Sequence, residues 1–304
     1  MAIGDFNGDG TADLVSTNAI PSTISVLLGT GGGSLGAALS KSVGFSPFHV
    51  AIADWNGDGN QDLVTANNSA GSVSILIGNG AGAFAAASSL ATAPGASCVA
   101  IGDLNGDAKS DLVVANTGAG PLWVGSATIL LGTGGGGFAA NPTNYYIGYK
   151  SIGVALADLN GDGTLDLVTA NYLGANVTAV AGDGLGRFRA PLGFAVGSDP
   201  NDLAVGDWSG DGIPDLVVET GDQNVRTLKG LGNGAFSNPT MYALGDAGFG
   251  VALADLNADG FLDIVTNSGS STVTILFGAA GAFSAPPSTS PRRWAPTTAS
   301  RSAT

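Results

Sequence analysis

The chain has 304 residues, a formal net charge of −14 and a hydrophobic fraction of 44%. Only 10 residues are basic, and they form no stripe with interleaved aromatics, which argues against nucleic acid as a partner. No apolar run reaches the ~18 to 20 residues that cross a bilayer, so we expect no membrane insertion. The single cysteine, Cys98, excludes a disulfide framework, and we interpret it as a small buried hydrophobe.

A nine-residue pattern organises the chain. It first occurs at residues 5–13 as DFNGDGTAD and begins again at Asp54, Asp103, Asp158, Asp207 and Asp255. These starts are 49, 49, 55, 49 and 48 residues apart, which indicates one array of repeated units rather than two unrelated domains. The predicted units are approximately residues 1–49, 50–98, 99–153, 154–202, 203–250 and 251–287. Residues 288–304, rich in Pro, Ser, Thr and Arg, are predicted to be disordered.

Each unit has the pattern of four short strands, as repeat 2 shows most clearly. Residues 50–53 alternate large and small side chains before the aspartate loop, and residues 62–67 and 73–77 are β-branched and strand-like. A glycine-rich turn follows, and we expect an outer strand to begin near Phe84. Four up-and-down strands repeated every ~49 residues predict an all-β fold, a β-propeller of six four-stranded blades.

The repeated loop has the side chains of a calcium site. Oxygen-bearing residues occupy positions 1, 3, 5 and 9, and glycine occupies position 6 in five of the six copies. Hard cations prefer such oxygens, and glycine permits the sharp turn around them. An EF-hand is excluded because position 12 carries no glutamate and a strand follows at once. The alternative is that these turns cap strands without metal. However, three aspartates in each of six loops make 18 of the 24 acidic residues, and no lysine or arginine recurs beside them.

A strand, an Asp-x-Asn-x-Asp-Gly-x-x-Asp loop, a second strand and a Leu-Leu-Gly … Gly-x-Phe segment resemble the FG-GAP or VCBS-type repeat. Its best-known relatives are the β-propeller heads of integrin α subunits. The resemblance covers roughly residues 1–287 and implies structural calcium, up to six ions, in loops between the first and second strands, opposite the ligand-binding face. It also implies an extracellular or cell-surface location, and it allows a seventh blade in the intact protein. Because the other repeats have a strand residue where Met1 stands, we expect a truncated start.

By this resemblance, five residues of each loop would hold the ion, and the residue at position 7 would contribute its backbone carbonyl. The six sets are Asp5, Asn7, Asp9, Thr11 and Asp13; Asp54, Asn56, Asp58, Asn60 and Asp62; Asp103, Asn105, Asp107, Lys109 and Asp111; Asp158, Asn160, Asp162, Thr164 and Asp166; Asp207, Ser209, Asp211, Ile213 and Asp215; Asp255, Asn257, Asp259, Phe261 and Asp263.

Two loops depart from this pattern. Ala108 replaces the position-6 glycine of loop 3, and Ser209 replaces the position-3 amide of loop 5. If position 6 needs a positive φ, an alanine there costs on the order of 1 kcal/mol. We therefore expect loops 3 and 5 to be the weakest sites. The residue at position 2 and the aromatic after the glycine turn are predicted to pack between blades.

The sequence favours a binding module over an enzyme. It has one histidine, His49, and one glutamate, Glu219, without a paired acid and base. We expect a non-catalytic recognition or adhesion module for a glycan or protein ligand. Repeat 3 carries about five extra residues around 120–125, and such an insertion commonly marks the binding face. Candidate ligand-binding residues are Phe48, His49, Trp123, Tyr149 and Tyr172. Two alternatives remain: a spacer within a larger surface protein, and the propeller of a polysaccharide-acting enzyme.

Overall fold

The structure is a computed structural model that describes residues 1–140, 142–244, 248–268, 273–279 and 282–283. The tail predicted at 288–304 lies outside these residues. Strands dominate, and η1 (Tyr172–Gly174) is a single 3-10 turn. In the described part of the chain, no helix is long and apolar enough to cross a bilayer.

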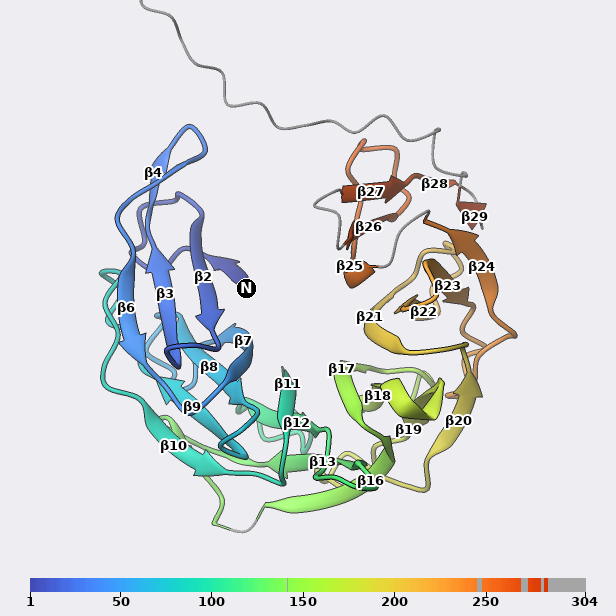
Figure 1. The fold of residues 1–304 in the computed structure, drawn as a ribbon, viewed down its shortest axis with the longest axis horizontal. Helices are drawn as coiled ribbons and strands as arrows, with labels where there is room; N and C mark the ends of the chain where they lie inside the picture. Colours follow the sequence, from blue (N-terminus) through green and yellow to red (C-terminus); the bar gives the residue numbers. More distant parts are fainter. Residues whose placement is uncertain (141, 245–247, 269–272, 280–281, 284–304) are drawn as a thin grey trace, which may run out of the picture.

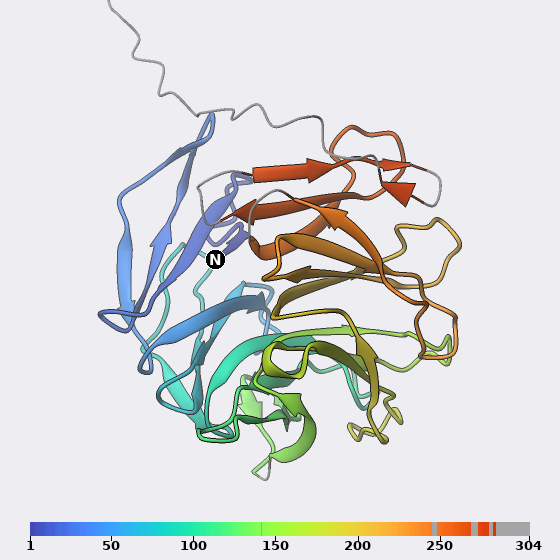
Figure 2. The same cartoon turned by 45° about the vertical axis from the view of Figure 1, so that its right-hand side comes forward.

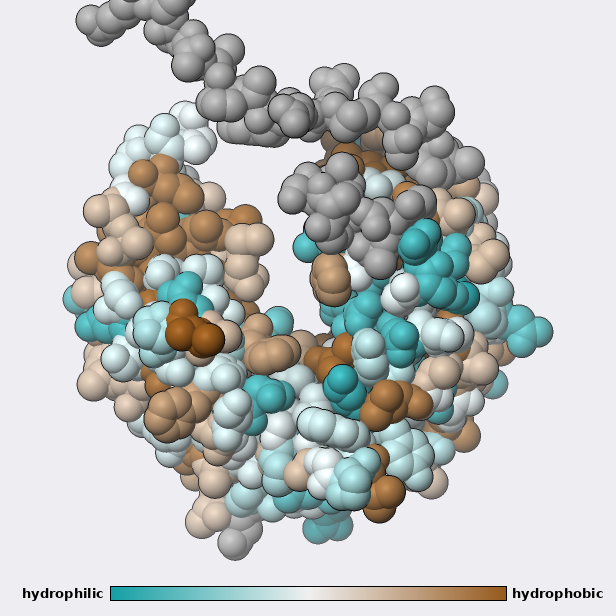
Figure 3. All heavy atoms as spheres, viewed as in Figure 1, coloured by the Kyte–Doolittle hydropathy of each residue, from teal (hydrophilic) through white to brown (hydrophobic). Residues whose placement is uncertain are grey.

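Six antiparallel sheets, the blades, are arranged around a central hollow (Figure 1, Figure 3). The first strand of each blade lies nearest the centre. These inner strands are β1 (Ala2–Gly4), β7 (Pro47–Ala53), β11 (Ala96–Gly102), β17 (Ser151–Ala157), β21 (Pro200–Gly206) and β25 (Gly248–Ala254). The second strands are β2 (Asp13–Asn18), β8 (Asp62–Asn67), β12 (Asp111–Asn116), β18 (Asp166–Asn171), β22 (Asp215–Thr220) and β26 (Asp263–Ser268).

The remaining strands complete each blade towards the outside. The third strands are β3 (Thr23–Leu27), β9 (Ser72–Leu76), β13 (Val124–Leu130), β19 (Asn176–Val180), β23 (Asn224–Leu228) and β27 (Val273–Leu276). The outer strands are β6 (Leu39–Ser42), β10 (Ser88–Ala91), β16 (Thr143–Tyr149), β20 (Leu192–Ala195) and β24 (Thr240–Ala243). Short hairpins lie between third and outer strands: β4 (Gly29–Gly31) with β5 (Ser34–Leu35), β14 (Gly132–Gly134) with β15 (Gly137–Phe138), and β28 (Gly278–Ala279) with β29 (Ala282–Phe283).

The predicted six-bladed propeller is confirmed. Five sheets have four strands, and the sixth has three within the described residues. The second strand of repeat 2 has the predicted bounds, whereas the inner strand begins three residues earlier, at Pro47. The expected start of the outer strand near Phe84 is wrong. Phe84 forms a bridge with Gly78, and β10 begins at Ser88, because the aromatic is needed between blades.

The core is divided into five buried clusters, and each joins two successive blades. Five of the six predicted anchors at loop position 2 take part by packing against the next blade, whereas Leu256 of blade 6 is exposed. The ring centroids of Phe6 and Phe84 are 5.5 Å apart, and those of Trp208 and Phe283 are 5.3 Å apart. The backbone closes the same junction, as the Gly82 N–H donates to the Phe6 carbonyl at 2.9 Å. Successive blades therefore pack face to face around the ring (Figure 2).

The two ends of the array differ from these junctions. Within the described residues, no buried cluster joins blade 6 to blade 1. Blade 1 exposes Ile3 (69%) and Leu35 (45%), and hydrophobic side chains gather on this side of it (Figure 3). Blade 6 exposes Leu256 (50%) and Val273 (65%). The equivalents of Leu35 and Val273 in neighbouring blades, Phe84 and Val225, are buried, so each end presents half of a blade junction.

Candidate functional site

All six aspartate loops connect an inner strand to the second strand of the same blade. In loop 1, the Asp5 carboxylate accepts hydrogen bonds from the backbone N–H groups of Gly8 (2.8 Å), Asp9 (3.2 Å) and Gly10 (2.9 Å). The Asp9 carboxylate accepts one from Thr11 at 2.7 Å. The carboxylates at positions 1 and 5 thus stabilise the turn by accepting hydrogen bonds from the backbone of their own loop. The bonds from the residues at positions 6 and 7 recur in all six loops.

The aspartate at position 9 has a different role from the other two. Asp62 is fully buried, and its two oxygens accept the N–H of Trp55 (2.9 Å) and of Gly78 (2.7 Å). The second of these bonds ties the start of the second strand to the end of the third in every blade. Burial raises the pKa of Asp62, as it does for Asp111, Asp166 and Asp215. These hydrogen bonds stabilise the blade.

Two loop positions require left-handed backbone. At position 6, Ala108 has a φ of 62°, where Gly59 has 86°. The positive φ that we expected to penalise Ala108 is therefore confirmed. Position 4 has the same requirement, since Ala258 has a φ of 60° where Gly57 has 75°. Sequence reasoning missed Ala258, although glycine at position 4 in the other five repeats was the available signal.

Lysines lie beside two loops, although no base recurs at the same position of the repeats. Lys109 Nζ is 3.2 Å from Asp107 Oδ2 in loop 3, and Lys229 Nζ is 2.9 Å from Asp211 Oδ2 in loop 5. Lys229 was missed because it comes from the end of the third strand, 18 residues after Asp211. Loop 5 is also shifted, because Ser209 rather than Trp208 donates its N–H to the position-9 carboxylate, at 2.8 Å. Each ammonium group is therefore paired with the position-5 carboxylate of its loop.

The donor set fits a hard divalent cation, since the side chains predicted to bind it offer only carboxylate, amide and hydroxyl oxygens. A carboxylate has about four lone-pair sites, and Asp5 uses three for its own loop. Within the described residues, no three Asp, Glu, His or Cys side chains converge on one point. Ion binding would therefore require the position-1 and position-5 carboxylates to turn towards a shared centre.

Three aromatic candidates lie on the turns at the opposite ends of the strands. Lys150 Nζ lies 4.2 Å from the ring centroid of Tyr172 and 5.7 Å from that of Trp123, so the structure brings Trp123 and Tyr172 to one cation. Tyr149 is next to Lys150 and packs edge-on against Tyr146, with centroids 6.1 Å apart. This aromatic cluster joins the insertion of blade 3 to the turn between β18 and β19 in blade 4.

Phe48 and His49 do not join this cluster. They lie on β7 of blade 2, and neither makes a ring contact with the cluster in the part of the chain that the structure describes. Phe48 is exposed, whereas His49 is half-buried with a buried Nδ1 that has no hydrogen-bond partner in the described part of the chain. Burial lowers the pKa of His49 to about 4, so this imidazole is neutral at physiological pH.

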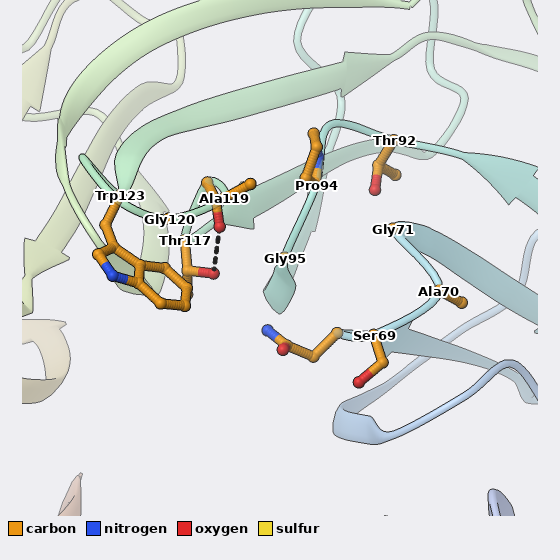
Figure 4. A pocket seen from close by; sticks show the side chains of 12 residues that line it. Ser69, Ala70, Gly71, Thr92, Pro94, Gly95, Thr117, Ala119, Gly120 and Trp123 are labelled. Carbon is orange, nitrogen blue, oxygen red and sulfur yellow. Dashed lines mark hydrogen bonds between the residues drawn. The ribbon is translucent and has the colours of Figure 1, made fainter.

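A groove of about 450 Å³ lies between blades 2 and 3 on this face (Figure 4). Its walls are the β8–β9 turn, the segment before β11 and the turn that contains the predicted insertion. The lining residues are Asn68, Ser69, Ala70, Gly71, Thr92, Pro94, Gly95, Thr117, Gly118, Ala119, Gly120 and Trp123. Sequence reasoning found Trp123 and the insertion but missed the blade 2 wall, because its small polar residues resemble any turn.

A buried acid pair between blades 5 and 6 was also missed. Glu219 is fully buried, with Oε1 accepting the Gly248 N–H at 3.0 Å and Oε2 without a hydrogen-bond partner among the residues that the structure describes. It pairs in register with Asp202, whose Oδ2 accepts the Val251 N–H at 3.1 Å. Burial is the main cause that raises the pKa of Glu219 to about 7 and that of Asp202 to about 6.

The repeated blades and aspartate loops agree with a known family of repeats. The model of the FG-GAP-like repeat matches residues 5–65, 54–114, 103–169, 158–218 and 217–266. The chain therefore belongs to the FG-GAP-like repeat family. No curated protein matches the sequence significantly.

Solved structures share the fold at low sequence identity. A lectin from Agrocybe aegerita, described as specifically recognising non-reducing terminal N-acetylglucosamine, is 19% identical with a TM-score of 0.62. The match covers 94% of this chain and 78% of the lectin. BBS1N in complex with ARL6DN is 13% identical with a TM-score of 0.63, covering 90% of this chain and 77% of the other. At these identities the likeness shows the fold alone.

Proposed function

We propose that this protein is a calcium-binding, non-catalytic propeller that recognises a glycan or protein ligand outside the cell or at its surface. The observation that carries the proposal is the sixfold repetition of an all-oxygen loop on a chain of net charge −14. Filling six loops with divalent cations would bring the formal charge to −2, since −14 plus 12 is −2. The binding free energy would then add to the folding free energy of blades that lack disulfides.

Recognition rather than catalysis is supported by where the titratable groups lie. His49 is on blade 2 and Glu219 is on blade 5, so they do not form an acid and base pair. Neither residue is among those that line the groove, and neither contacts the Lys150 ammonium group that joins Trp123 and Tyr172. The Agrocybe aegerita lectin shows that a propeller of this fold can recognise a sugar. FG-GAP-like repeats are typical of extracellular proteins, which is consistent with the proposed location.

A glycan array and pull-downs of candidate protein ligands, each with calcium and with chelator, test this function. We expect a ligand that is captured with calcium and lost in chelator, because emptied loops would loosen the blades that carry the binding turns. Turnover of a polysaccharide would contradict the non-catalytic proposal. Equal capture under both conditions would contradict the role of calcium.

A spacer role in a larger surface protein is the second candidate. The exposed edges of blades 1 and 6 favour it, because Ile3, Leu35 and Val273 are apolar side chains that a neighbouring unit would cover. A protein that binds no glycan and no peptide, yet associates through these edges, would support the spacer over the recognition module.

A further inference from the structure

The groove between blades 2 and 3 carries no charged side chain. All twelve residues that line it are neutral. A charged ligand would find no ion-pair partner there and would lose its hydration. The volume of about 450 Å³ lies within the range of small-molecule sites. The groove therefore suits a neutral ligand.

Trp123 is held in the groove at a conformational cost. It has a φ of 49°, and the equivalent turn residues Ser22, Gly71, Ala175 and Gln223 also have a positive φ, although a bulky residue is disfavoured in this region. The backbone N–H of Trp123 donates to the Ala119 carbonyl at 3.2 Å, and its carbonyl accepts the Lys150 N–H at 2.7 Å. Trp123 is nevertheless 39% exposed. An exposed indole offers a flat surface for stacking.

Hydrogen-bonding groups face the indole across the groove. The side chains of Asn68 and Ser69 make no hydrogen bond to any other residue that the structure describes, and Ser69 lies on the wall opposite Trp123 (Figure 4). The Thr92 and Thr117 hydroxyls donate to the carbonyls of Ala93 (3.0 Å) and Gly118 (3.2 Å), so their oxygens remain available as acceptors. The groove has an aromatic ring on one side and neutral donors and acceptors on the other. These match a pyranose, which has an apolar C–H face and polar hydroxyl groups.

We propose that this groove binds one neutral sugar ring, stacked on Trp123 and hydrogen-bonded to Asn68, Ser69 and Thr92. The proposal rests on the proposed recognition function and names its ligand class. An extended peptide suits the groove less well, because its walls are turns and offer no strand edge for a peptide to extend. An acidic sugar suits it less well because Lys150 does not line it.

Saturation-transfer NMR and calorimetric titration with galactose, mannose and N-acetylglucosamine test the proposal, with glucuronic acid as the acidic comparison. We expect one or more neutral sugars to bind. The substitution Trp123→Ala should lower that affinity at least about tenfold, and Ser69→Ala about threefold. Leu122→Ala is the matched control, since Leu122 is exposed in the same turn but does not line the groove. Unchanged melting temperatures would show that each variant folds.

The outcomes separate this proposal from the proposed function. If arrays or pull-downs capture a ligand but Trp123→Ala leaves its affinity unchanged, recognition stands and the groove assignment is overturned. The same holds if a peptide or glucuronic acid binds in preference to every neutral sugar. If neither the neutral sugars nor any ligand in the arrays and pull-downs binds, both the groove assignment and the recognition function are overturned.

Discussion

The connections on one face of the propeller are alike in all six blades, whereas those on the opposite face differ from blade to blade. On the loop face, the backbone amides at positions 6 and 7 donate to the same carboxylates in all six blades. On the opposite face, the corresponding turns differ, since blade 3 has an insertion with Trp123 and blade 4 has the 3-10 turn η1. Repetition indicates a function that each blade needs for its own stability. Variation indicates a function that the whole protein needs once.

The largest expected effect separates two roles among the aspartates of one loop, namely stabilising the blade and binding the ion. Asp62→Ala leaves the N–H groups of Trp55 and Gly78 buried without an acceptor. We expect a loss of about 3 kcal/mol in the free energy of unfolding, with or without calcium. Asp54→Ala, in the same loop but exposed, is the control. Its effect should depend on calcium, and urea unfolding in calcium and in chelator would measure both. Equal calcium dependence of the two variants would contradict this division.

The next effect concerns the acid pair between blades 5 and 6. Because the pKa of Glu219 is raised from 4.5 to about 7 by burial, its ionisation destabilises the folded state fully above pH 7 and not at all below pH 4.5. Glu219→Gln keeps the acceptor for Gly248 and removes this cost. We expect it to add roughly 2–3 kcal/mol to the free energy of unfolding at pH 8 and little at pH 4.5. Chemical denaturation across this pH range checks it, and a gain that is independent of pH would contradict the assignment.

A smaller effect tests the energetic cost of the left-handed backbone in the loops. Ala108→Gly and Ala258→Gly relieve left-handed alanines at positions 6 and 4, and we expect each to stabilise the protein by roughly 0.5–1 kcal/mol. Ala86→Gly, at an exposed alanine without positive φ, should instead be neutral or destabilising. Thermal melts of the three variants would measure this. Destabilisation by all three substitutions would show that the left-handed backbone carries no penalty here.

The smallest effect distinguishes the loops from one another. Lys229→Met removes the ammonium group from Asp211 in loop 5, so we expect calcium to bind that loop severalfold more tightly. Lys41→Met is the control, because Lys41 lies on the outer strand of blade 1 and has no ion-pair partner among the described residues. Calorimetric titration at low salt would detect the change. An unchanged or weaker binding isotherm would show that the lysine does not compete with the ion.

Features that recur in every blade were predicted best from the sequence. The second strand of repeat 2 was placed to the residue because Asp62 both ends the loop and starts the strand. The junction role of Phe6 and Trp208 was also predictable, since one apolar residue recurs at that position. Features made by one blade alone, or by contact between distant segments, were not. Lys229 reaches loop 5 from another strand, and the acid pair of Asp202 and Glu219 forms across a register that only the fold defines.

The site was predictable in part for the same reason. Trp123 was found because an insertion in one repeat is visible by comparison with the others. Its partners across the groove, Asn68 and Ser69, belong to the preceding blade, and nothing in their sequence context distinguishes them from an ordinary turn. Phe48 and His49 carried the same kind of signal as Trp123, but the fold places them away from the aromatic cluster.

The central claim is that calcium fills the loops and holds the blades. The most direct measurement combines the metal content of the purified protein with its melting temperature in calcium and after chelation. The account predicts several bound calcium ions per chain, up to one per loop, and a melting temperature that falls when calcium is removed and recovers when it is restored. Protein that carries no metal and melts at the same temperature in calcium and in chelator would contradict it.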